Sequence, residues 1–89
     1  MTNEEEVVKL GDDAEALLKS DAFNRTVNQL VDATFQAFVN SKPEETEARA
    51  NAYSHYRAIV DIVSTLQQRV AVRDQANEKA QQGDNNQEE

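Results

Sequence analysis

Residues that break helices are rare in this chain of 89 amino acids. Glycine occurs only at Gly11 and Gly83, and the single proline is Pro43. Chains that turn often need many such residues, so their scarcity favours a few long helices over strands and tight turns. The spacing of the apolar residues agrees with this, and we predict an all-α fold.

Two long helices are predicted, over residues 21–40 and 43–79. The first has apolar residues every three or four positions, which places them on one helix face, and Ser20 or Asp21 caps its start. In the second, the steps between apolar residues alternate between four and three, which is the spacing of a heptad seam. Together the two faces give the predicted core: Phe23, Val27, Leu30, Val31, Phe35, Phe38, Ala52, Tyr56, Ile59 and Val63.

The start of the second long helix has two interpretations. Pro43 suits the first turn of a helix, and the acids that follow it complement the positive end of the helix dipole. Alternatively, Ser41 and Glu44 form a capping box, which would make Lys42 helical.

The ends of the chain are predicted to be less ordered than its middle. Residues 1–11 form a flexible acidic segment that ends at Gly11, and a short helix covers residues 13–19. The helical domain therefore spans residues 12–80. The polar stretch over residues 81–89 has no apolar side chain and is predicted to be a disordered acidic tail.

The short connection between the long helices makes them antiparallel neighbours, so a helical hairpin is predicted. At 1.5 Å of rise per residue, the second helix extends about 25 Å beyond the first. The N-terminal helix or another copy of the chain must cover Leu66 and Val70 in that extension. Two or three small helices bury little apolar surface by themselves. We therefore predict that the chain associates into an oligomeric helical bundle. The candidate interface residues are Leu17, Leu18, Tyr53, Leu66, Val70, Arg69 and Arg73.

The net charge of −8 comes mostly from the two ends, because residues 42–79 contain as many basic as acidic side chains. Direct contact with nucleic acid is not expected from so acidic a chain. Arg69 and Arg73 are neighbours on one helix face. They either pair with acids such as Asp12, Asp13 or Glu15 of another chain or belong to a solvated face.

The stretch Tyr53-Ser54-His55-Tyr56-Arg57 contains the single histidine and both tyrosines. A metal site would need further ligands one helical turn from His55, and the residues there are Asn51, Ala52, Ala58 and Ile59. No nucleophile or acid is placed beside the imidazole, so we predict no catalytic, metal or cofactor site. The chain has no cysteine and no phosphate-binding glycine loop.

No secretion signal and no membrane-spanning segment are expected from the sequence. The predicted location is the cytoplasm.

One resemblance has a bearing on function. Residues 20–70 resemble a group of small helical-hairpin proteins of tailed phages and prophages, mostly of unassigned function. The resemblance rests on Phe35-Gln36-Ala37-Phe38, Ser41-Lys42-Pro43-Glu44, Glu47-Ala48-Arg49, Tyr53, Tyr56-Arg57-Ala58-Ile59 and Leu66. It implies a phage setting rather than an activity, so the expected location is the cytoplasm of a host cell, or the virion.

Three functions without catalysis are therefore expected. The first is a virion or head-assembly component that works by protein–protein interaction. The second is a small acidic inhibitor of a host protein, acting against host defence or on transcription. The third is a plain dimerisation module.

Overall fold

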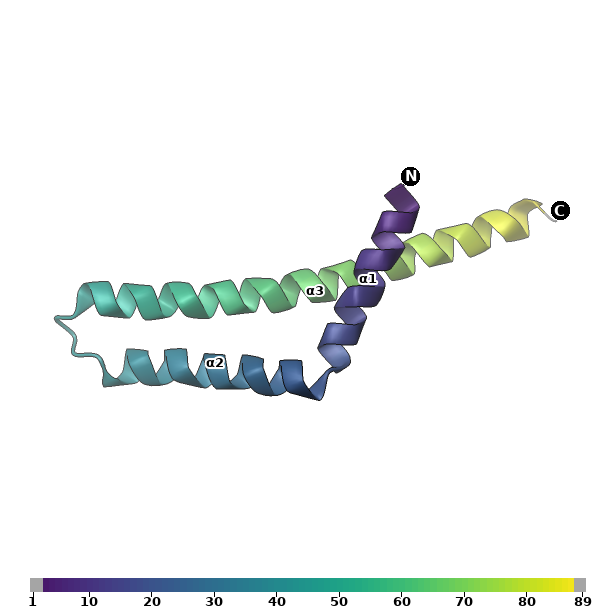
Figure 1. Ribbon diagram of the computed structural model, residues 1–89. Coiled ribbons are helices and arrows are strands. Elements are labelled where there is room, and N and C mark those ends of the chain that lie inside the picture. Colours follow the sequence, from purple (N-terminus) through teal and green to yellow (C-terminus); the bar gives the residue numbers. More distant parts are fainter. Residues whose placement is uncertain (1–2, 88–89) are drawn as a thin grey trace. The chain divides into compact units, whose positions relative to one another are not determined.

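In the computed structural model the chain forms α-helices joined by short connections (Figure 1). The structure describes the backbone of residues 3–87 and the side chains of residues 3–82. Helix α1 spans Asn3–Lys19, α2 spans Asp21–Asn40 and α3 spans Thr46–Gln87. The described residues contain no strand, so the all-α prediction is confirmed for them.

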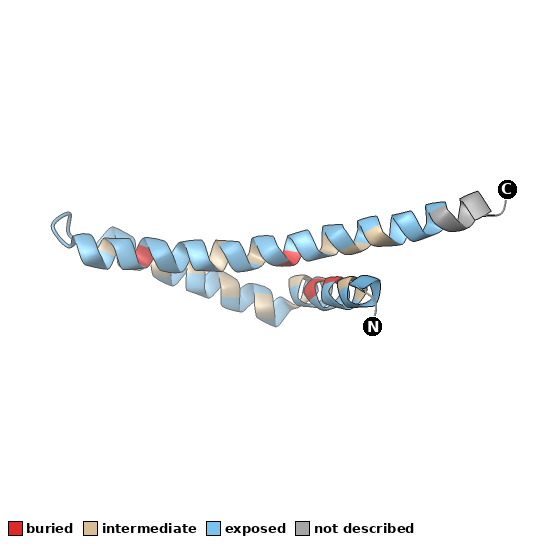
Figure 2. Ribbon diagram, turned by 90° about the horizontal axis from the view of Figure 1, so that it is seen from above, coloured by how far each residue is buried: buried red, intermediate tan, exposed pale blue. Residues whose placement is uncertain are grey.

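The contacts within the chain divide it into two compact units, and each unit includes a part of α3. The first unit consists of Met1–Leu18 and Thr65–Glu89, and in it α1 contacts the C-terminal part of α3. The second unit is Lys19–Ser64, in which α2 lies beside the N-terminal part of α3 (Figures 1 and 2).

Hydrogen bonds at both ends of α2 explain its bounds. The Ser20 hydroxyl accepts a hydrogen bond from the backbone N–H of Phe23 at 3.2 Å, as expected of an N-cap. At the other end, the hydroxyl of Ser41 donates to the carbonyl of Phe38 at 2.6 Å. The prediction of a helix over residues 21–40 that begins after Ser20 is therefore confirmed.

The predicted start of the next helix at Pro43 is wrong, because α3 begins at Thr46. Pro43 lies in a turn that the backbone N–H of Glu45 closes by donating to the carbonyl of Lys42 at 2.9 Å. The Glu45 carboxylate in turn accepts from the N–H of Lys42 at 2.7 Å. This reciprocal pairing resembles a capping box one residue later than expected. Glu45 directly precedes α3, and its carbonyl accepts from the N–H of Arg49 at 3.1 Å.

The N-terminal prediction also needs correction. Residues 1–11 were predicted to be flexible, with a helix only over 13–19, but α1 begins at Asn3 and passes through Gly11 without a break. Three glutamates in its first turn complement the positive end of the helix dipole. Packing against α3, described below, offsets the weak helix propensity of glycine. Met1 and Thr2 lie outside the described residues.

The predicted acidic tail, residues 81–89, is helical as far as Gln87, because α3 does not stop at residue 79. Once a helix has formed, each further residue adds a backbone hydrogen bond, and no proline ends this one. Glu88 and Glu89 lie outside the described residues.

Few apolar side chains are buried (Figure 2). Among residues 3–82 the buried ones are Ala14, Ala52 and Leu66, at 1%, 6% and 8% exposed. Within a single chain the predicted core is therefore enclosed only in part, because two packed helices can cover only a narrow stripe of each other. Of its ten members only Ala52 is buried, whereas Phe23, Val27, Val31, Ile59 and Val63 are half-buried and Leu30, Phe35, Phe38 and Tyr56 are exposed.

Candidate interaction surface

A groove with aromatic walls runs along the contact between α2 and α3 in the second unit. Its α2 wall contains Val31, Phe35 and Phe38, and its α3 wall contains Tyr53 and Tyr56. The four aromatic side chains each keep between 41% and 60% of their surface exposed. Clustered apolar exposure of this kind marks sites of protein–protein contact, so this aromatic groove is the candidate binding surface.

The floor of the aromatic groove is made of small side chains. Thr34 and Ala52 line it, and Ala52 is buried. The Thr34 hydroxyl donates to the carbonyl of Val31 at 2.8 Å, so this polar group has its partner within α2. Asp32, on the α2 wall, is the acidic residue among those that line the groove.

Two arginine side chains of α3 lie near the aromatic groove, although neither is among the residues that line it. The guanidinium carbon of Arg49 is 4.4 Å from the centroid of the Phe38 ring, a cation–π contact that holds the two helices together near their connection. Arg57 lies one helical turn after Tyr53 and forms an exposed ion pair with Asp61 at 3.3 Å. The groove thus has a carboxylate on its α2 wall, and α3 carries guanidinium groups outside the lining.

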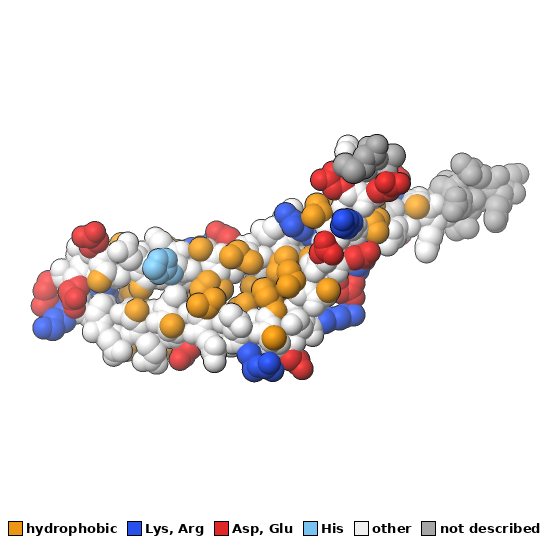
Figure 3. Space-filling view, viewed as in Figure 1, with side chains coloured by type: hydrophobic (Ala, Val, Ile, Leu, Met, Phe, Trp, Pro, Cys, Tyr) orange, Lys and Arg blue, Asp and Glu red, His pale blue; other side chains and the backbone are white. Residues whose placement is uncertain are grey.

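A second groove flanks the same pair of helices and shares Thr34 and Ala52 with the first. Figure 3 shows the face that carries the single histidine (pale blue), with hydrophobic side chains gathered between α2 and α3. We call this second groove the alanine groove. Besides Thr34 and Ala52, the residues that line it are Leu30, Ala33, Ala37, His55, Ala58 and Ile59. The second unit therefore has a bulky groove and a small-residue groove.

The stretch from Tyr53 to Arg57 contributes to both grooves. Tyr53 and Tyr56 line the aromatic groove, whereas His55 lines the alanine groove among aliphatic side chains. Consecutive helix positions differ by about 100°, which accounts for the separation of these neighbours. The residues that line the alanine groove with His55 include no carboxylate, and the hydroxyl among them, that of Thr34, donates to the carbonyl of Val31.

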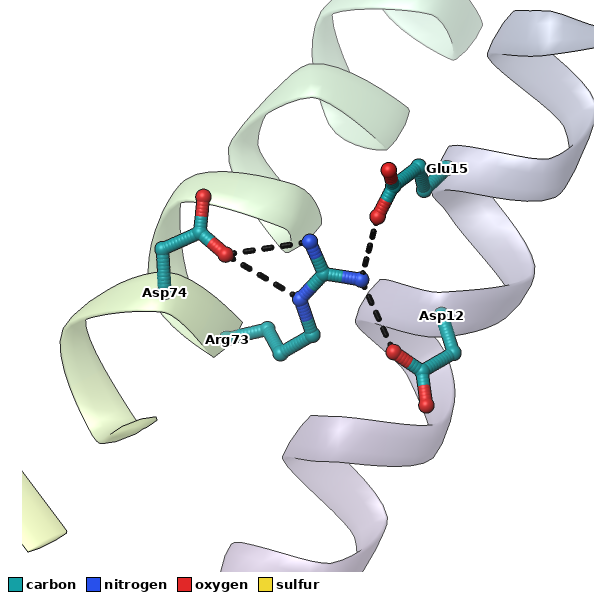
Figure 4. Close-up of polar contacts among 4 residues, drawn as sticks. All are labelled: Asp12, Glu15, Arg73 and Asp74. Atoms are coloured by element: carbon teal, nitrogen blue, oxygen red, sulfur yellow. Dashed lines mark hydrogen bonds and ion pairs between the residues drawn. The ribbon is translucent and has the colours of Figure 1, made fainter. Parts of the chain in front are cut away.

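In the first unit, Arg73 of α3 joins α1 through an ion-pair cluster (Figure 4). One guanidinium nitrogen, Nη1, contacts Glu15 Oε1 at 2.6 Å and Asp12 Oδ1 at 2.8 Å. Asp74, from the same helix, accepts from Nη2 at 3.0 Å and from Nε at 3.1 Å. The Arg73 side chain is only 12% exposed, so these contacts are partly shielded from water.

The cluster fixes the charge of Arg73. Hydrogen bonds to Glu15, Asp12 and Asp74 raise the pKa of its guanidinium further above its ordinary value, so it remains a cation. The prediction that Arg73 meets Asp12 or Glu15 identified the right side chains. It was wrong to place them in another chain, because the contact forms within one chain.

Gly11 allows α1 to approach α3 closely at the same place. A Cβ atom at this position would collide with the Cβ of Arg73 and lie 3.0 Å from the carbonyl oxygen of Arg69. Both obstacles belong to, or are fixed on, the α3 backbone and cannot turn away. One turn later Ala14 is buried, so the two small residues form the α1 side of the contact.

Replacing Arg73 with glutamine should loosen α1. The neutral amide leaves Asp12 and Glu15 without their cation, so backbone amides of α1 should exchange with deuterium on the order of tenfold faster. Arg69→Gln is the matched control, because Arg69 is exposed one turn earlier on α3. Equal protection of α1 in both variants would show that the ion pairs do not hold it.

The predicted interface residues have different environments. Leu66 is buried within the first unit, where α1 rather than another copy covers it, so it is not available as an interface residue. Leu17 and Tyr53 are exposed, at 43% and 60%. The others are half-buried or polar: Leu18, Val70 and Arg73 are half-buried, and Arg69 is exposed.

Two searches of the described residues found no special site. No group of three or more histidine, aspartate or glutamate side chains is placed to hold a metal ion. Within the same residues, none of the helices combines the length and the apolar character that crossing a bilayer requires.

Comparison with known proteins gave no match to any protein-family model, to any curated protein or to any solved structure.

Proposed function

We propose that this chain is a non-enzymatic protein that works by protein–protein interaction through the second unit. The exposed aromatic groove carries this proposal. In water each exposed aromatic side chain forgoes the stabilisation that burial brings, and a partner surface would recover it. Charge supports the same role, because Asp32 and the arginines provide polar contacts at the edge of an apolar patch.

We further propose that the second unit acts as an antiparallel helical hairpin that associates into an oligomeric helical bundle. Two helices cover only the stripe around Ala52, and both flanking grooves are open to solvent. Four helices around one core bury both inner faces, which is the usual way in which helical hairpins are completed.

The proposed setting is a tailed phage, with the protein as a virion or head-assembly component. The resemblance over residues 20–70 supports this setting, and a small oligomeric helical module suits an assembly role. Mass spectrometry of purified virions and of assembly intermediates from the encoding phage should detect the chain in at least one of them. Its absence from both would contradict the assembly role.

A double variant tests whether the assembly role depends on the aromatic groove. Phe35→Ser with Tyr53→Ser removes two exposed aromatic rings, so the helical content should stay while the protein is lost from the particle or intermediate. Ile62→Ser is the control, since its side chain is 56% exposed outside the aromatic groove. If the double variant were incorporated as well as the control, the groove would not be the binding surface.

The second candidate function, inhibition of a host protein, rests on the same groove. An open apolar groove between two helices can accept an amphipathic helix of a partner. A host protein that binds in high salt and is lost in the Phe35→Ser, Tyr53→Ser variant but retained by Ile62→Ser would favour inhibition. Failure to find such a protein would leave the assembly role as the one supported.

A further inference from the structure

We propose that the occupant of the aromatic groove is the aromatic groove of a second copy, related by a two-fold axis parallel to the helices. In this arrangement α2 of each copy lies on α3 of the other. The inference rests on the proposed function and specifies its surface and symmetry. It is carried by the area of the groove and by the placement of its charges.

The exposed aromatic area is large enough to form the centre of a dimer interface. An aromatic side chain buries roughly 150–250 Å² when fully enclosed. With between 41% and 60% of each ring exposed, the four rings offer roughly 400 Å² per copy. A stable interface needs about 800 Å² from each partner, so the rings supply about half of it. The side chains at the rim of the groove would supply the remainder.

The charges in and beside the groove are self-complementary. Asp32 lines the α2 wall, whereas Arg57 follows Tyr56 on α3, one helical turn after Tyr53, and lies outside the residues that line the groove. When α2 of one copy lies on α3 of the other, Asp32 faces Arg57 of the partner subunit. The two-fold axis repeats this contact, so each dimer gains two ion pairs at the edges of an apolar core.

The alternative two-fold arrangement places α2 on α2 and α3 on α3. It brings Asp32 towards the same carboxylate of the partner subunit, and Arg57 towards a second arginine. Like charges in such positions oppose association. The distribution of charge therefore favours the arrangement in which unlike helices meet.

The existing partner of Arg57 is compatible with this dimer. Its ion pair with Asp61 joins side chains that are 50% and 66% exposed, and such a pair contributes little to stability. Arg57 has several donor N–H groups, so it can contact Asp61 and a carboxylate of a second copy together.

The alanine groove is a weaker candidate for the same occupant. Its walls contain small aliphatic side chains and His55, and no acidic or basic pair lies across it. Aromatic and arginine side chains are the ones enriched at the centres of protein interfaces. The aromatic groove has both kinds, through its four rings and the Arg49 guanidinium stacked on Phe38.

Two charge reversals test the arrangement directly. Asp32→Arg and Arg57→Asp each place like charges at both rim contacts, so each variant alone should dimerise on the order of a hundredfold more weakly. Mixed in equal amounts, the two variants should form a heterodimer, because both contacts then join opposite charges. Sedimentation velocity of each variant and of the mixture measures this, and circular dichroism checks that the helices persist.

Other results would overturn the proposal. If Asp32→Arg alone dimerised as strongly as the wild-type chain, and formed a heterodimer with the wild-type chain more strongly than either chain dimerised alone, then α2 would lie on α2. If both reversals stayed dimeric while Ile62→Arg became monomeric, the dimer would use a surface outside the aromatic groove. A wild-type chain that stays monomeric throughout would exclude a second copy as occupant, while the virion measurement would still test the proposed function separately.

Discussion

Replacing Leu66 with alanine should lower the free energy of unfolding of the first unit by about 2–4 kcal/mol. Leu66 is the largest buried side chain among the described residues, at 8% exposed. The truncation removes apolar contacts and leaves a cavity between α1 and α3 that the backbone cannot fully close. Urea unfolding followed by circular dichroism measures the change.

Ile62→Ala is the matched control for this experiment. Ile62 is one turn earlier on α3 and 56% exposed, so its truncation should change the free energy of unfolding by less than about 1 kcal/mol. Equal losses for the two variants would mean that Leu66 is not enclosed by α1.

Replacing Gly11 with alanine should destabilise the contact between α1 and α3, although helix propensity alone predicts the opposite. In an isolated helix the change stabilises by about 1 kcal/mol. Here the added methyl collides with the Cβ of Arg73 and meets the Arg69 carbonyl, so the helices must separate. Overpacking of this kind costs about 1–3 kcal/mol, and separation also weakens the Arg73 ion pairs. Hydrogen exchange of α1 amides should therefore become faster.

Asp13→Ala is the control that distinguishes lost packing between α1 and α3 from a change in helix propensity. Asp13 is exposed on α1 two positions from Gly11, and alanine there raises helix propensity without meeting α3. Amide exchange in α1 should become slower or stay unchanged. If Gly11→Ala slowed exchange as well, α1 would not pack closely on α3.

The sequence predicted α2 well because local chemistry determines its ends. Ser20 and Ser41 supply hydroxyl groups to backbone partners within three residues, so no distant contact is needed. The part of α1 that precedes the predicted helix over residues 13–19 was missed for the opposite reason. Gly11 indicates a break when it is considered alone, and only contact with Arg69 and Arg73 of α3 shows why glycine lies within a helix.

The aromatic groove was also missed, although the sequence contained a signal for it. Viewed down the helix axis at 3.6 residues per turn, apolar residues of α2 cover roughly two thirds of its circumference. This apolar arc extends from Ala33 to Val39. A single neighbouring helix covers far less than that, so part of the apolar surface had to remain open. Phe35, Phe38 and Tyr56 were assigned to the core because period alone does not show how many helices are present to cover them.

Sedimentation equilibrium of the full chain, from micromolar to hundreds of micromolar, is the most direct test of the central claim that the aromatic groove is an interaction surface completed by a second copy. The account predicts a mass of twice the 10.0 kDa of one chain for the wild type. It predicts the single-chain mass for Phe35→Ser with Tyr53→Ser, whereas Ile62→Ser should remain dimeric. A wild-type chain that keeps a mass of 10.0 kDa over the whole range would contradict the account.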